Sequence, residues 1–261
     1  MDGQMKILSL CSGYGGLDMA VEQHFSAKTA YWSDVDKTAR DVMAARFPNA
    51  QPIGDLTTLD LAMIHADVVT AGYPCQPFSN AGNRLGEKDE RHLWPYIRNT
   101  ISVLRPRYVV LENVAGHLSL GAAAVVGDLT ALGYDAKWTV IRASDVGAPH
   151  QRKRWFCVAT DTDGARLERY RTEHELREAS EEKPFSWGRY DRAIRRWERV
   201  LGRPASAPVV DNRLSAVFVE WMMGLEEGHV TDIAPSRAKA LACLGNGVVP
   251  QQAKRALELL T

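Results

Sequence analysis

Short apolar runs that suit β-strands alternate with segments of helical character up to Thr160. Alternating strands and helices predict an α/β chain built on a Rossmann-like, doubly wound and mostly parallel sheet. Strands are expected over Lys6 to Leu10, Thr29 to Ser33, Val68 to Ala71, Tyr108 to Leu111, Ala136 to Ile141 and Trp155 to Ala159. Helices are expected over Leu17 to His24, Lys37 to Phe47, Leu93 to Leu104 and Pro250 to Leu260.

Polar or reactive residues follow four of these strands. Cys11, Asp34, Cys75 and Glu112 each come at the end of an apolar run or just after it. Ligands of doubly wound sheets bind at the carboxyl ends of the strands. The four residues are therefore predicted to share one edge of the sheet.

Cys75 lies between two prolines in the segment Gly72-Tyr73-Pro74-Cys75-Gln76-Pro77. Each proline fixes its own φ and biases the preceding residue towards extended geometry, so the thiol is expected on a stiff turn. A positioned thiol suits nucleophilic chemistry if its surroundings favour the thiolate. The alternative is that Cys75 is a small buried hydrophobic residue.

Composition mainly limits the classes of partner. The 261 residues carry 32 basic and 32 acidic side chains, so any site for a polyanion must be a local patch. The four cysteines form no CxxC pair, which argues against a zinc site, any other metal site or a disulfide framework. The sequence shows neither a signal peptide nor an apolar run of membrane-spanning length, so we expect a cytoplasmic protein with no membrane partner.

The segment Ser12-Gly13-Tyr14-Gly15-Gly16 lies between an expected strand and an expected helix. Its glycines let the backbone approach a ligand at a helix N-terminus, although the complete dinucleotide fingerprint is missing. Asp34 would suit the diol of a ribose. The segment and Asp34 together indicate a nucleoside cofactor, with a helix-capping aspartate as the alternative.

Charged residues near two later strands complete the candidate site. Glu112 begins Glu112-Asn113-Val114 at the end of a buried strand, where desolvation raises the pKa of a carboxyl group. A helix cap or a structural hydrogen bond is the alternative role for Glu112. The segment Gln151 to Arg154 precedes the next strand, and side-chain alternation is expected to place Arg152 and Arg154 on one face.

Composition changes after Thr160, and residues 161–210 are highly charged. Arginines recur there at helical spacing, with Trp187, Tyr190 and Trp197 among them. Two interpretations of this segment remain open. It could form a solvated helix face with ordinary ion pairs, or a surface that contacts the phosphates and bases of a nucleic acid. The arginines are Arg189, Arg192, Arg195, Arg196, Arg199 and Arg203.

In order and spacing, these motifs resemble those of the cytosine-C5 DNA methyltransferase family of prokaryotic and phage type, which uses S-adenosylmethionine. The motifs are Cys11 to Gly16, Pro74-Cys75-Gln76, Glu112-Asn113-Val114, Gln151 to Arg154 and Gly245-Asn246-Gly247-Val248. The resemblance implies a class I methyltransferase fold. Residues 1–160 and 211–261 would form the catalytic domain, and residues 161–210 a small inserted target-recognition region.

The resemblance also implies a role for each matching residue in methylating C5 of a cytosine flipped out of duplex DNA. Cys75 would add to C6, Glu112 would bond N3 and the exocyclic amine, Arg154 would contact the base oxygen and Arg152 would support the Cys75 loop. S-adenosylmethionine would be held by Cys11, Gly13, Tyr14, Gly15, Gly16, Asp34, Val35, Asp55, Leu56, Pro74, Leu93, Asn246, Gly247 and Val248. DNA would be contacted by Gln76, Ser79, Arg189, Arg192, Arg195, Arg196 and Arg199.

Some positions depart from the family pattern. Cys11 and Val35 stand where the family commonly has aromatic residues that pack on adenine, which would weaken cofactor binding by about 1 kcal/mol. His150 replaces the first glutamine of the arginine motif, and Ala81 replaces a small polar residue. The variable region is short, which indicates a brief or relaxed recognition sequence.

Two other functions stay open beside DNA methylation. The same chemistry on RNA is one, because relatives that methylate tRNA share these motifs. A binding module that no longer turns over is the other. A cysteine hydrolase is disfavoured because no histidine has a convincing general-base context. We expect a monomer, with a cognate restriction endonuclease or a phage or host genome as its biological setting.

Overall fold

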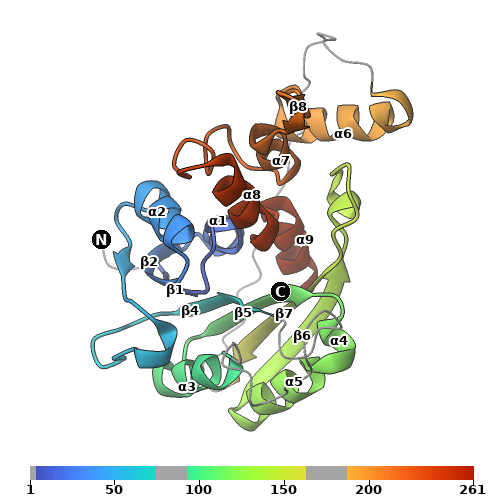
Figure 1. Ribbon diagram of the computed structural model, residues 1–261. Coiled ribbons are helices and arrows are strands. Elements are labelled where there is room, and N and C mark those ends of the chain that lie inside the picture. Colours follow the sequence, from blue (N-terminus) through green and yellow to red (C-terminus); the bar gives the residue numbers. More distant parts are fainter. Residues whose placement is uncertain (1–3, 75–92, 163–186) are drawn as a thin grey trace.

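The computed structural model describes residues 4–74, 93–162 and 187–261. Its central sheet has seven strands in the order β3-β2-β1-β4-β5-β7-β6 (Figure 1). The strands are β1 (Lys6–Leu10), β2 (Lys28–Ser33), β3 (Gln51–Pro52), β4 (Val68–Gly72), β5 (Tyr108–Val114), β6 (Tyr134–Ile141) and β7 (Arg154–Asp161). The pairs from β3 to β5 are parallel, and β7 runs antiparallel to both β5 and β6. The expected doubly wound, mostly parallel sheet is confirmed.

Helices cover both faces of this sheet (Figure 1). They are α1 (Gly16–Phe25), α2 (Lys37–Arg46), α3 (Trp94–Leu104), α4 (His117–Leu120), α5 (Ala122–Ala131), α6 (Asp191–Leu201), α7 (Ala216–Met222), α8 (Arg237–Asn246) and α9 (Pro250–Leu260). Short 3-10 turns lie at η1 (Leu56–Thr58), η3 (Ala143–Val146) and η4 (Gly188–Tyr190). Among the described helices, none is long and apolar enough to cross a lipid bilayer.

Alternation along the central strands divides the core into two layers. On one face, Leu8 and Leu10 of β1 pack in a cluster with Ile97 and Ile101 of α3. On the other face, Ile7 of β1 shares a cluster with residues of α1 and α9. Because both faces are covered, these strands consist almost entirely of apolar residues, which is why their positions were predictable.

A second core joins the C-terminal segment to the sheet domain. It contains Trp197 of α6, Trp221 of α7 and Leu244 of α8, together with Tyr14 from the loop after β1. The Trp197 indole donates to the carbonyl oxygen of Trp221 at 3.0 Å. The domain boundaries at residues 160 and 210 stay a prediction.

The structure adds elements that the sequence analysis did not anticipate. Helix α5 is one, because its alanine- and valine-rich sequence has no clear polar face. Helix α8 is another, and it continues through Gly245 and Asn246, the first two residues of the Gly245-Asn246-Gly247-Val248 motif. Gly247 follows as its C-cap in extended backbone, with φ of −82°.

Candidate active site

The carboxyl ends of β2, β1, β4 and β5 lie next to one another in the sheet. Leu10 pairs with Ser33 and with Ala71, and Gly72 pairs with Glu112. Cys11, Asp34, Pro74 and Glu112 therefore share the predicted edge. Cys75, Gln76, Ser79 and Ala81 lie outside the described residues, so their predicted roles are not placed.

Tyr14 fastens the glycine-rich loop to the far end of the chain. The side chain is completely buried, and its hydroxyl donates to the carbonyl oxygen of Val248 at 2.6 Å. The imidazole Nε2 of His229 lies 2.9 Å from the carbonyl oxygen of Tyr14. The Tyr14 side chain is thus part of the protein interior, where its hydroxyl group connects the glycine-rich loop to Val248.

Two glycines permit this close approach. A Cβ on Gly16 would lie 2.1 Å from the carbonyl oxygen of Val248, and one on Gly247 would lie 1.8 Å from the Tyr14 ring. Gly13 differs, because it has φ of +57° and the nearest atom to its hypothetical Cβ is the Gly247 Cα at 3.9 Å. The backbone of Gly13 and the Gly247 Cα therefore border a glycine cradle that is free of side chains beside Gly13, whereas the Tyr14 ring fills the other side of Gly247.

Two backbone N–H groups position the Asp34 carboxylate and leave some of its lone pairs available to a ligand. Its Oδ2 accepts from the Gly13 N–H and its Oδ1 from the Asp36 N–H, both at 2.8 Å. Burial raises the pKa of the Asp34 carboxyl, although these two hydrogen bonds oppose the shift. Asp36, rather than Asp34, caps α2. The arrangement suits an acceptor for a vicinal diol and argues against the helix-capping role.

Residues expected around a nucleoside base follow β1, β2 and β3. Asp55 caps η1 by accepting from the Thr57 N–H at 2.8 Å, and Leu56 is buried behind it. Val35 is 69% exposed and Cys11 is half-buried, so both leave apolar surface near Asp34. A glycine cradle, a diol acceptor and apolar neighbours together fit the nucleoside and the methionine part of S-adenosylmethionine.

The remaining candidate cofactor residues lie around the same region. Leu93 is the N-cap of α3 and is half-buried, and Pro74, which follows Tyr73 in the chain, is exposed. Asn246 is exposed at the end of α8, beside the buried Gly247 and Val248. Gly15 has a left-handed φ of +82° at the N-cap of α1. These placements are compatible with the predicted contacts, which stay predictions.

Glu112 and Arg154 form a buried ion pair across β5 and β7. Arg154 Nε lies 2.8 Å from Glu112 Oε1, and their side chains are only 17% and 7% exposed. Burial raises the pKa of Glu112 to about 7, and the nearby guanidinium groups of Arg154 and Arg152 only partly oppose it. A carboxyl group with this pKa can give and take a proton near neutral pH.

Arg152 is held differently from Arg154. Its Nη2 donates to the carbonyl oxygens of Gly245, at 2.9 Å, and of Gly247, at 2.5 Å. Strand alternation does not extend to Arg152, because β7 begins at Arg154 and Arg152 has a left-handed φ of +32°. The turn at Arg152 sends its side chain to the C-terminus of α8.

Three residues that the sequence analysis did not single out anchor the start of the Cys75 segment. The Asn113 side chain donates to the carbonyl oxygen of Tyr73 at 3.0 Å, and the Tyr73 hydroxyl lies 3.0 Å from His117 Nε2. Burial lowers the pKa of His117 to about 4, so the imidazole is neutral at physiological pH. Only the position of Asn113 inside the Glu112-Asn113-Val114 motif could have indicated this role.

The described cysteines are poor nucleophiles. Burial raises the pKa of each of the thiols of Cys11, Cys157 and Cys243 to about 12. These thiols stay protonated at neutral pH, whereas nucleophilic attack needs a thiolate.

The arginines of the variable region have distinct surroundings. Arg195 pairs with Asp191 at 2.8 Å, and Arg196 Nε donates to the carbonyl oxygen of Gly147 at 3.1 Å. Arg189 lies over the ring of its neighbour, Tyr190, with 4.9 Å between its Cζ and the ring centroid. Arg192 and Arg199 are exposed, seven positions apart on α6 and hence on one helix face. Neither has a hydrogen-bond or ion-pair partner within the described parts of the chain.

Comparison with known sequences identifies close matches to one family. A family model described as C-5 cytosine-specific DNA methylase matches residues 5–200. Type II methyltransferase M.NlaIV of Neisseria lactamica is 32% identical over 175 residues, which cover 60% of this chain and 41% of that protein. M.CviJI of Paramecium bursaria Chlorella virus IL3A is 32% identical over 163 residues, 60% of this chain and 44% of that protein. The matches thus span less than half the length of these relatives.

Solved structures share the fold over nearly the whole chain. The Dnmt2 methyltransferase of S. pombe has a TM-score of 0.68 at 17% identity, covering 97% of both chains. A putative DNA modification methyltransferase encoded within a prophage of E. coli has a TM-score of 0.67 at 16% identity, covering 98% of both. At this identity the likeness shows the fold, and it confirms the methyltransferase fold class expected from the sequence.

Proposed function

Because the chain belongs to the C-5 cytosine-specific DNA methylase family, we propose that it methylates C5 of cytosine in duplex DNA, with S-adenosylmethionine as the methyl donor. The observation that carries this proposal is the buried Glu112–Arg154 pair, at the same edge of the sheet as Asp34 and the glycine cradle. The Glu112–Arg154 pair suits a pyrimidine ring, and Asp34 with the glycine cradle suits a nucleoside cofactor. The motif containing Cys75 follows β4, which lies between β1 and β5 in the sheet.

The pyrimidine would be activated by a covalent bond to the enzyme. The Cys75 thiolate attacks C6 of the flipped cytosine, and electron density moves to C5. Glu112, with its pKa near 7, donates a proton to N3 as the ring becomes electron-rich. The ring then carries a nucleophilic C5 that can accept a methyl group. Loss of the C5 proton, release of Cys75 and return of the N3 proton to Glu112 restore the aromatic base.

The two arginines have separate roles in this scheme. Arg154 extends from β7 to Glu112, and its Nη1 donates to the carbonyl oxygen of Lys153, so Nη2 is the group that would bind the oxygen at C2 of the base. Arg152 is bound to the carbonyl oxygens of Gly245 and Gly247. We infer that Arg152 acts by fixing the end of α8 beside the site.

S-adenosylmethionine would supply the methyl group from its sulfonium and would leave as S-adenosylhomocysteine. Gly13 and Gly247 would form the backbone cradle for its methionine part, and Asp34 would accept from the ribose hydroxyls. Val35 and Leu56 would contact the adenine ring. The missing aromatic side chains at Cys11 and Val35 would make this affinity lower than aromatic packing gives.

The proposed setting follows from the substrate. Duplex DNA hides C5 and C6 within the base stack, so the target cytosine must be flipped out. We expect a monomeric enzyme in the cytoplasm of a bacterial cell, encoded by the host or by a phage. A cognate restriction endonuclease is the expected partner in function.

The test is a trapping experiment with duplex DNA that contains 5-fluorocytosine. Fluorine at C5 blocks the final elimination, so the enzyme stays bound through Cys75 when S-adenosylmethionine is present. We expect a denaturant-resistant complex for the wild-type protein and none for Cys75→Ser, which should still bind S-adenosylmethionine.

The other outcomes separate the remaining functions. An adduct with fluorocytosine-containing RNA and none with DNA would favour RNA as the substrate. Cofactor binding without any adduct would favour a binding module. An adduct that persists in Cys75→Ser would exclude Cys75 as the nucleophile.

A further inference from the structure

A small hairpin precedes α7 in the chain, and its apolar, polar and charged side chains are all exposed. In it, β8 (Val209–Val210) pairs antiparallel with β9 (Arg213–Leu214). Asp211 and Asn212 form the turn with left-handed φ of 49° and 60°, the geometry of a tight two-residue hairpin. Every residue from Val209 to Leu214 is exposed.

The hairpin is fixed at its base and free along its length. The Ser215 N–H donates to the carbonyl oxygen of Pro208 at 2.9 Å, which closes the hairpin. Arg237 Nη1 donates to the carbonyl oxygen of Leu214 at 3.0 Å. The aliphatic side chains beyond this base remain in solvent, since Val209 and Val210 are 55% and 53% exposed. The hairpin therefore presents the aliphatic side chains of Val209, Val210 and Leu214 to solvent.

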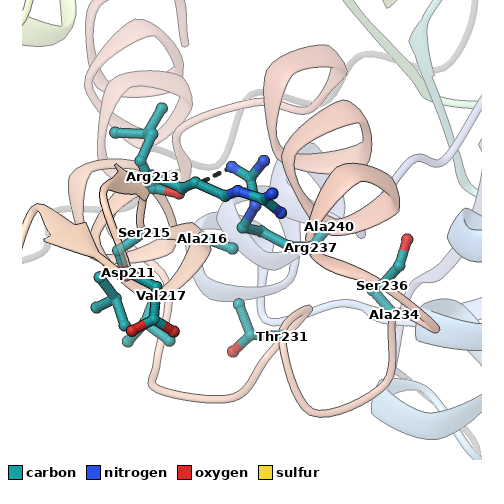
Figure 2. A pocket seen from close by; sticks show the side chains of 12 residues that line it. Asp211, Arg213, Ser215, Ala216, Val217, Thr231, Ala234, Ser236, Arg237 and Ala240 are labelled. Atoms are coloured by element: carbon teal, nitrogen blue, oxygen red, sulfur yellow. Dashed lines mark hydrogen bonds between the residues drawn. The ribbon is translucent and has the colours of Figure 1, made fainter.

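A cavity of about 600 Å³ lies between the hairpin and the start of α8, which meet where Arg237 donates to the carbonyl oxygen of Leu214. Figure 2 shows Asp211 and Arg213 on one side of this cavity and Ala234 and Ser236 on the other. The hairpin therefore does not pack against α8 along its length, and one of its flanks is open.

The charges around the hairpin favour a polyanion. Arg213 and Arg237 line the cavity, and Asp211 is the one acidic residue among its described lining residues. Arg213 has no ion-pair partner within the described chain. On α6, whose Trp197 packs with the Trp221 of α7, the side chains of Arg192 and Arg199 are exposed as well.

We propose that the β8–β9 hairpin enters the major groove of the DNA substrate and reads its sequence, an inference that rests on the proposed function. The major groove admits a two-stranded ribbon. Asn212 can bond the edge of adenine, Arg213 the edge of guanine, and Asp211 the amino group of cytosine, while a valine methyl can contact the methyl group of thymine. Asp211 and Asn212 form the turn, and Val210 and Arg213 flank it as a pair on the two strands.

Helix α6 then has a different task from sequence reading. Two of its arginines are occupied, Arg195 by Asp191 and Arg196 by the carbonyl oxygen of Gly147. Arg192 and Arg199 remain to contact phosphates, which gives affinity without sequence information. The arrangement divides affinity and specificity between two neighbouring elements.

The experiment compares hairpin variants with an α6 variant on a duplex library. Asp211→Gly and Asn212→Gly remove the side chains and keep the left-handed turn, which glycine adopts readily. Arg213→Ala removes the third reading group, and Arg192→Ala/Arg199→Ala is the matched control. Methylated sites are sequenced, and DNA affinity is measured across a range of salt concentrations. Thermal unfolding and S-adenosylmethionine binding confirm that each variant is folded.

We expect Asn212→Gly and Arg213→Ala to lose about tenfold or more in preference for one base position, with other positions unchanged. The α6 control should lose affinity for all sequences alike, and the magnitude of its salt slope should fall by about two. Unchanged base preference in all three hairpin variants would overturn the inference, as would a wild-type enzyme without sequence preference. A wild-type protein that neither binds nor methylates duplex DNA would instead overturn the proposed function, and the hairpin's role with it.

Discussion

Glu112 shows how the surroundings of a single residue set its chemistry. Desolvation disfavours the carboxylate, and the Arg154 guanidinium at 2.8 Å favours it. Desolvation is the larger effect, so the pKa is raised to about 7 from a usual value of 4.5. An acidic residue at a strand end predicted the location of Glu112, but the balance between these effects depends on which residues pack around it.

The raised pKa of Glu112 predicts a pH dependence. The proton-donating form dominates below pH 7, so the single-turnover rate of methylation should fall as the pH rises through about 7. Glu112→Gln should lower the rate about 100-fold and remove this inflection. The measurement is single-turnover methylation at saturating S-adenosylmethionine between about pH 5.5 and pH 9. A rate without an inflection near pH 7 would contradict the assignment.

The same shift affects stability with a fixed sign. Between about pH 4.5 and pH 7 the folded protein binds more protons at Glu112 than the unfolded chain does. The contribution of Glu112 to stability is therefore lost as the pH rises through 7. Denaturant unfolding of the wild-type protein and Glu112→Gln at several pH values would show it as a difference between the two.

At the scale of elements, strands and helices differed in how well the sequence predicted them. The bounds of β1 and α9 match their predictions, because β1 is a continuous apolar run and α9 begins at Pro250 in its first turn. Strand β5 continues to Val114, beyond its apolar run, because Glu112 and Asn113 keep their pairing with β7. Helix α5 lacks the polar face that would have indicated it.

Two glycines at the end of α8 provide a matched pair of predictions. Gly247→Ala would bring a Cβ to 1.8 Å from the ring of Tyr14, which is buried and hydrogen-bonded and so has no room to retreat. We expect a loss of more than about 2 kcal/mol in the free energy of unfolding. Gly245→Ala meets nothing within 4 Å and should be neutral or stabilising by up to about 1 kcal/mol. Urea unfolding of both variants checks this, and equal effects would refute the close packing of Gly247.

At the scale of the whole molecule, the two ends of the chain build one site together. The Tyr14 hydroxyl binds the carbonyl oxygen of Val248, and Arg152 binds that of Gly247. Gln252 of α9 extends this connection, because its side-chain amide donates to the carbonyl oxygens of Ile141 at 2.7 Å and Arg152 at 2.8 Å. Segments more than 200 positions apart thus fix the same edge of the sheet, as the 234-residue separation of Tyr14 and Val248 shows.

Gln252 therefore supplies a prediction about the whole fold. Gln252→Leu keeps the approximate size of a completely buried side chain but leaves two carbonyl oxygens without this donor. We expect a loss of about 1–3 kcal/mol in stability and weaker binding of S-adenosylmethionine, because the Arg152 turn loses its support. Gln23→Leu, at an exposed position of α1, is the control and should change neither quantity. Titration and thermal unfolding measure both, and wild-type cofactor affinity in Gln252→Leu would contradict the coupling.

The sequence by itself determined the alternation of strands and helices and the residue types at the strand ends. These features are local, since apolar periodicity and the chemistry of Asp34 or Glu112 can be read within a few residues. Tertiary structure alone decided that Arg152 turns to α8, that Tyr14 is interior and that His117 holds Tyr73. Each of these contacts joins segments that are distant in sequence, and no local sequence pattern predicts such a contact. The geometry of each contact is set by the packing of several elements at once.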